Sequence, residues 1–267
     1  MDRLSRLVSK FCQEYVQAIM PCHGALALPI AMTLAVVAGR VEAVSPLAAG
    51  TYRLEMRFGS HADLPFVGAV RSTTVSTSLV DIRARDGALE QTHRVCDAHL
   101  EGAAPGVRVE MPSRFIAALG THSYPIAVSW DGAGWRYHAD LGMEYVGWHP
   151  DDDAPLPASP DDPGVYDWDG DGRPAATLRL IVPILPAGEL YVVQRAHSVL
   201  DGRMVAPDRV EGRIDLPLFE QAVIGARPGF LRRSPRATQD PERSRFVLER
   251  VATGTACPDL VEARSGR

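Results

Sequence analysis

The sequence predicts an all-β protein built as an antiparallel meander barrel, with a β-sandwich as the alternative. In several segments apolar and polar residues alternate with the two-residue period of a half-buried strand. Short turns such as Asp86-Gly87 join neighbouring segments, as in antiparallel hairpins. Strands do not alternate with amphipathic helices, which disfavours a parallel α/β sheet. Several segments are longer than the strands of an immunoglobulin-like sandwich, so a tilted barrel is preferred.

The N-terminal segment has the three-part layout of a secretory leader. Basic residues at its start precede an apolar run over 24–38, and Val41-Glu42-Ala43 suits a signal peptidase. The run is shorter than the ~20 residues of a spanning helix, although an uncleaved anchor is the alternative. We therefore expect a signal peptide over 1–43 and a single domain over 44–267 without a membrane span, in the periplasm or outside the cell.

The first half of this domain contains three expected strands and one helix. Apolar residues alternate with Arg and Glu over Thr51–Phe58. A Val-, Thr- and Ser-rich strand over 66–84 is joined through the Asp86-Gly87 turn to a strand over 88–100. Proline near the start and glycine at the end of 112–120 predict a short helix. It is the only helix expected after the leader.

The second half is expected to contain a hairpin, a long loop and the remaining strands. Ile126–Trp130 and Trp135–Leu141 flank a turn at Asp131–Gly134. Proline and aspartate dominate the following stretch, which predicts a surface loop over 149–174. Further strands are predicted over 175–185, 189–200, 203–216 and 245–252, with turns at Pro186–Gly188 and Asp201–Gly202.

This predicted order of strands is similar to that of lipocalin-like proteins, in architecture only. Small barrels of this kind enclose either a packed core or an apolar cavity. The resemblance implies a binding protein for a small apolar ligand or a lipid. The side chains expected inside the barrel are those of Tyr52, Leu54, Met56, Val70, Leu178, Leu180, Val192 and Ile214.

Two cysteines, Cys96 and Cys257, remain after removal of the leader. An even pair in an exported chain predicts one disulfide. Two separate buried thiols are the alternative.

The most distinctive motif is Asp167-Trp168-Asp169-Gly170-Asp171-Gly172-Arg173. Aspartates at positions one, three and five can converge on one hard cation where glycines allow tight curvature. Gly172 occupies the sharp-turn position, and the backbone carbonyl of Arg173 follows it. In these residues the stretch resembles the calcium loops of EF-hands, dockerins and aspartate-rich bacterial repeats. The resemblance implies a structural calcium ion held by Asp167, Asp169, Asp171 and Arg173.

The motif departs from an EF-hand in three ways. Ala175 stands at position nine, Leu178 replaces the bidentate glutamate of position twelve, and Pro163-Gly164 precedes the loop instead of a helix. Additional oxygens would have to come from Asp161, Asp162 or 151–153. We expect weak binding, with a dissociation constant of about 10⁻⁴–10⁻³ M. An Asp- and Gly-rich turn without metal is the alternative.

All four tryptophans lie between positions 130 and 168. Aromatic faces beside carboxylates are typical of sugar-binding surfaces, so a carbohydrate or cell-envelope binding module is an alternative function. Trp130 and Trp135 flank a hairpin, however, where cross-strand aromatic pairs stabilise a sheet.

The sequence contains no GxSxG, SxxK or Cys-His pattern of a nucleophilic enzyme. His93, Cys96 and His99 cannot share an ion if they lie on one extended strand. Binding is therefore favoured over catalysis, and an envelope-polymer hydrolase that uses carboxylates of the long loop is a second alternative. The net charge of −5 does not favour a nucleic-acid partner.

Overall fold

The computed structural model describes residues 46–64, 68–102, 106–150, 154–181, 187–232 and 237–265. The chain separates into two units, Met1–Glu42 and Ala43–Arg267, and everything below concerns the second. The predicted signal peptide and the aspartates at 151–153 lie outside the described residues.

The described residues form one antiparallel sheet, and the predicted all-β class is confirmed. The sheet contains eleven strands. Their bounds are β1 Gly50–Leu64, β2 Gly68–Arg85, β3 Ala88–Glu101, β4 Arg108–Glu110, β5 Thr121–Trp130, β6 Trp135–Val146, β7 Ala176–Ile181, β8 Gly188–Ala206, β9 Arg209–Arg227, β10 Ala237–Gln239 and β11 Arg245–Arg250.

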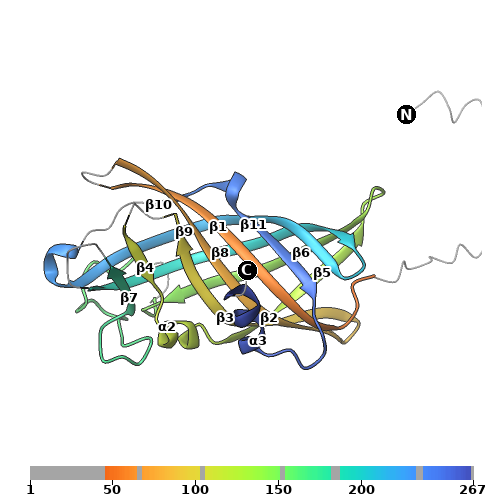
Figure 1. Cartoon of the computed structure of the whole chain (residues 1–267), viewed down its shortest axis with the longest axis horizontal. Helices are drawn as coiled ribbons and strands as arrows, with labels where there is room; N and C mark the ends of the chain where they lie inside the picture. The colour runs from red at the N-terminus through yellow and green to blue at the C-terminus, as the bar shows by residue number, and fades with distance from the viewer. Residues whose placement is uncertain are drawn as a thin grey trace, which may run out of the picture. The chain divides into compact units, whose positions relative to one another are not determined.

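Eight of these strands close into a ring that is not a regular barrel (Figure 1). The order of pairing around the ring is β1, β2, β3, β5, β6, β8, β9 and β11. The ring closes because β11 pairs with β1. The order follows the chain, as expected of a meander. Strands β4, β7 and β10 lie off the ring. One edge of β8 pairs first with β7 and then with β6, so β7 and β4 extend the sheet beyond the ring.

The interior of the ring is filled by side chains at one end. Inward residues alternate along the strands, so Tyr52 and Leu54 of β1 pack against Phe246 and Leu248 of β11. The full cluster consists of Leu47, Tyr52, Leu54, Val80, Ile82, Ile126, Tyr137, Ala139, Leu141, Leu200, Val210, Ile214, Phe246 and Leu248. This end of the ring is therefore a packed core.

The residues expected inside the barrel divide between two clusters. Ile214, like Tyr52 and Leu54, belongs to the packed core, and Met56 packs against it. Leu178 and Val192 belong to a second cluster around Phe115. Val70 and Leu180 are only half-buried. The second cluster lies where β7 and a short helix meet the ring.

The turn predicted at Asp201–Gly202 is wrong, because β8 continues through it to Ala206. Gly202 pairs with Gly212 of β9, and a Cβ atom built on Gly202 would lie 2.8 Å from the ring of Phe246. Glycine is required here for close packing, not for a turn. The chain reverses at residues 207–208 instead.

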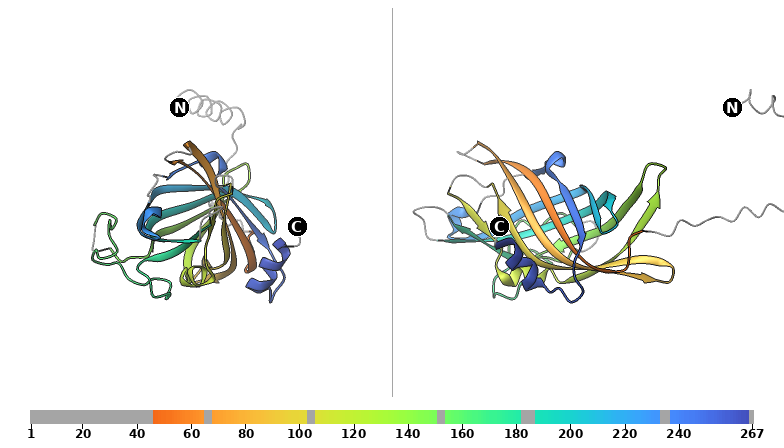
Figure 2. Two further views of the ribbon diagram at one scale, coloured as in Figure 1. Left: turned by 60° about the vertical axis from the view of Figure 1, so that its left-hand side comes forward. Right: turned by 45° about the vertical axis from the view of Figure 1, so that its right-hand side comes forward.

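Two α-helices are present in the described residues, so the expectation of a single helix is wrong. The predicted helix is α2, Ser113–Ala118. The second is α3, Cys257–Ser265, which packs on β2 and β3 and lies outside the ring (Figure 2). The predicted disulfide is confirmed, and it ties α3 to β3 through Cys96 and Cys257 with a Cα–Cα distance of 5.0 Å.

Two single 3-10 turns, η1 (Gly229–Leu231) and η2 (Pro241–Arg243), complete the described structure. Within that part of the chain, no helix has the length and apolar character needed to cross a membrane.

Candidate metal centre

The aspartate loop lies directly before β7 and is closed at its neck by backbone hydrogen bonds. Trp168 N–H donates to the carbonyl of Ala175 over 3.1 Å, and Ala175 N–H donates to the carbonyl of Tyr166 over 2.8 Å. The ring of Trp168 packs edge-on against Phe115 of α2, with 5.2 Å between centroids. The loop is thus attached to both β7 and α2.

The curvature of the loop depends on Gly170 and Gly172. Their φ angles are +68° and +80°, in the left-handed region where a side chain is strained. Arg114 of α2 donates to the carbonyl of Gly170 over 3.3 Å. The glycines therefore have the role that the sequence pattern predicts for them.

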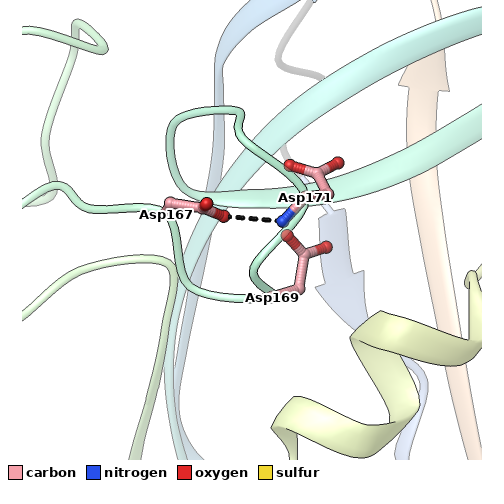
Figure 3. Close-up of side chains that lie close together, drawn as sticks. All are labelled: Asp167, Asp169 and Asp171. Carbon is pink, nitrogen blue, oxygen red and sulfur yellow. Dashed lines mark hydrogen bonds between the residues drawn. The ribbon is translucent and has the colours of Figure 1, made fainter.

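The three aspartate carboxylates converge, as the spacing predicts (Figure 3). One oxygen from each of Asp167, Asp169 and Asp171 lies within 4.8 Å of the other two. Calcium binds oxygens at about 2.3–2.6 Å, so two ligands of one ion can lie up to about 5 Å apart. The spacing of the oxygens is compatible with a shared calcium ion.

Backbone N–H groups orient the two outer carboxylates. Asp167 accepts hydrogen bonds from Asp171 N–H at 3.0 Å and Gly172 N–H at 2.9 Å. Asp171 accepts one from Arg173 N–H at 2.8 Å. These local bonds hold the side chains in place while each oxygen keeps a further lone pair for a cation.

Asp169 is the buried member of the group, with 8% of its surface exposed. Its Oδ2 accepts a hydrogen bond from Thr177 N–H at 3.0 Å, but its Oδ1 is buried and has no hydrogen-bond partner. Burial, followed by the charges of Asp171 and Asp167, raises the pKa of this carboxyl, and the backbone N–H groups of Thr177 and of Asp169 itself oppose the rise. A buried charged oxygen without a partner is unfavourable, and a bound cation would compensate it. The residues present therefore fit a hard cation.

The expected contribution of Arg173 is limited to its backbone. Its guanidinium lies 3.4 Å from the carboxylate of Glu189 on β8. A guanidinium has no lone pair to offer a metal ion, so the carbonyl oxygen of Arg173 is the predicted ligand.

The other oxygens expected from the long loop are placed differently. The carboxylate of Asp162 accepts hydrogen bonds from Ala158 and Ser159 N–H, so it caps its own turn. Asp161 is exposed. Thr177, whose N–H bonds to Asp169, has a buried hydroxyl without a partner. The position of Thr177 beside the aspartate loop was not predicted. The only indication of it in the sequence is a hydroxyl in an otherwise apolar stretch.

The four tryptophans do not share one surface. Trp130 and Trp135 are cross-strand neighbours at the β5–β6 hairpin, with ring centroids 5.7 Å apart. Trp148 is 2% exposed and packs in a third cluster with Tyr191, under the long loop. Trp168 packs beside Phe115. All four rings thus make contacts with another ring or with the core.

A groove of about 540 Å³ lies between β3 and β4. Its walls come from the end of β3, from β4 and the start of α2, and from one residue of β7. The lining residues are Ala98, His99, Leu100, Arg108, Val109, Glu110, Met111, Pro112, Ser113 and Arg179.

Comparison of the chain with models of protein families, with curated proteins and with solved structures found no match to any of them.

Proposed function

We propose that this chain is an exported, calcium-supported β-protein that binds a small apolar ligand or lipid. The observation that carries the proposal is the unpartnered, buried Oδ1 of Asp169 beside two further carboxylates. Three carboxylates in so small a space repel one another unless a cation is shared. Asp167, Asp169 and Asp171 would hold the ion, with the Arg173 carbonyl as a fourth group.

The loop supports this function because it connects β7 and α2. Asp169 is bonded to Thr177 of β7, and the loop also contacts α2 through the bond from Arg114 to Gly170. Both elements continue into the groove, β7 through Arg179 and α2 through Ser113. A cation that draws the loop together thus stabilises two walls of the groove.

The groove is the preferred ligand site because the end of the ring around Tyr52 and Phe246 is filled. A volume of about 540 Å³ falls within the range of about 300–1,000 Å³ that is usual for small-molecule sites. Its lining includes the apolar residues Leu100, Val109 and Met111. Binding at this place requires no catalytic group.

The calcium part is tested by thermal unfolding of the full-length chain. With a dissociation constant of about 10⁻⁴–10⁻³ M, about 10 mM calcium should add roughly 1.5–3 kcal/mol to the free energy of unfolding. The melting temperature should then rise by about 3–10 °C. Asp169→Asn should abolish the increment, because it removes the buried charge while keeping the shape of the side chain.

Asp86→Asn is the matched control, since Asp86 is an exposed aspartate in the turn between β2 and β3, outside the cluster. Its calcium response should equal that of the wild type. A wild-type melting temperature that is the same with calcium and with a chelator would make the loop a plain turn and remove calcium from the proposal.

A further inference from the structure

Strand β4 follows β3 in the chain but does not pair with it, and this separation creates the groove. The pairing of β5 with β3 ends at Thr121 and Arg94, so β3 from Val95 to Glu101 keeps only β2 as a partner among the described strands. Strand β4 pairs with β7 instead of β3. Two strand edges therefore face each other across a gap. Where Cα atoms of β3 and β4 lie within 8 Å of each other, the gap is too narrow for a further strand.

The inner side of this gap is apolar. Ala98 is 8% exposed and pairs with Ser76, which in turn pairs with the inward residue Met56, so Ala98 faces the ring interior. Leu100, two residues further along, lies on the same face. On the other side, Val109 and Met111 pack against the cluster around Phe115. These two walls offer apolar contacts on both sides of the groove.

The outer rim carries two guanidinium groups and one carboxylate, that of Glu110. Arg108 is exposed, and within the described part of the chain its side chain has no hydrogen bond or ion pair. Among the described residues, Arg179 pairs only with Glu110, at 4.0 Å, and both side chains are substantially exposed. So long a contact is a weak ion pair. An anionic group at the rim would gain two charge-assisted partners, because guanidinium groups match the geometry of carboxylates.

We propose that the groove binds a single-chain anionic amphiphile, such as a free fatty acid. Its hydrocarbon chain would lie between the Ala98–Leu100 and Val109–Met111 walls, and its carboxylate at Arg108 and Arg179. This inference rests on the proposed function, because it names the ligand class for the binding site proposed above. It adds that the head group must be anionic, which a purely apolar site would not require.

Isothermal titration calorimetry of the full-length chain tests the proposal with decanoate and decanol, both below the concentrations at which they aggregate. Decanoate should bind roughly ten-fold more tightly than decanol. Arg108→Gln and Arg179→Gln should each weaken decanoate binding by roughly three- to ten-fold and leave decanol binding unchanged. Arg83→Gln is the control, because Arg83 is an exposed arginine paired with Asp81 away from the groove.

The outcomes separate the inference from the proposed function. Equal affinities for the two ligands, or arginine variants that bind decanoate as the wild type does, would overturn the anionic head-group site and leave apolar binding in place. Binding of neither ligand would overturn both. A loss in Arg83→Gln equal to that in Arg108→Gln would assign the effect to net charge and also overturn the site.

Discussion

Gly202 of β8 and Gly212 of β9 lie directly opposite each other, and the ring of Phe246 lies over both. A Cβ atom at Gly212 would lie 2.2 Å from the Asp201 carbonyl oxygen and 2.5 Å from the Phe246 ring. The facing glycines let a phenyl ring from β11 enter the interior beside Tyr137, with centroids 5.7 Å apart. Close backbone approach at this point makes the packed end of the ring possible.

Gly212→Ala should therefore destabilise the protein. Overpacking of a filled core typically costs about 1–3 kcal/mol, and here the clash includes backbone atoms that cannot rotate away. Chemical denaturation should show a lower midpoint. Gly229→Ala is the control, since a Cβ there meets no atom within 4 Å and should change the midpoint little. Equal midpoints for the two variants would contradict this account of the interior.

His93 should make stability depend on pH. Burial, followed by the charge of His122, lowers the pKa of His93 from 6.5 to about 4, and its ring packs edge-on against Tyr124. The folded state holds this histidine neutral, so the unfolded state binds the proton first as pH falls from 6.5 towards 4. Above about pH 6.5, His93 therefore has little effect on the free energy of unfolding. Below that pH the free energy of unfolding falls progressively, by roughly 2 kcal/mol between about pH 7 and about pH 5.

Urea titrations at these two pH values, for the wild type and His93→Gln, measure this contribution. The variant should lose less stability on acidification, because its side chain takes up no proton. His61→Gln, at an exposed position of β1, is the comparison and should behave as the wild type. If the free energy of unfolding changes with pH in His93→Gln as it does in the wild type, groups other than His93 control the acid sensitivity.

Tyr137 and Gln91 form a buried pair whose two members depend on each other. The hydroxyl of Tyr137 donates to Gln91 Oε1 at 2.5 Å, and both residues are almost completely buried. Tyr137→Phe leaves the Gln91 oxygen without a donor and should cost about 1–3 kcal/mol. Tyr137→Phe combined with Gln91→Leu should recover much of that loss, because both polar partners are then removed. Additive losses in this double-mutant cycle would contradict the coupling.

The disulfide should be a major source of stability. It joins residues separated by 161 positions, for which the chain-entropy model allows up to roughly 5 kcal/mol, with observed effects usually about 2–4 kcal/mol. Replacing both Cys96 and Cys257 by alanine should lower the melting temperature and make it insensitive to reductant. A wild-type melting temperature that does not change on reduction would mean that the bridge contributes little.

Sequence patterns with a short range were sufficient for several features of the fold. The alternation in Thr51–Phe58 predicted β1, because a strand places every second residue on the same face. The proline and glycine around 112–120 predicted α2 for a similarly local reason. Helix α3 escaped prediction because the disulfide and its packing on β2 and β3 hold it, and neither contact is local.

For the aspartate loop, the sequence by itself determined the convergence of Asp167, Asp169 and Asp171, since glycines and N–H groups within the same few residues bend the loop. Only the tertiary structure decided that Asp169 is the buried member with an unpartnered oxygen. It likewise decided that Gly202 belongs to a strand, and that β4 separates from β3 to leave a groove. These features depend on the pairing and packing of separate elements, which local periodicity does not encode.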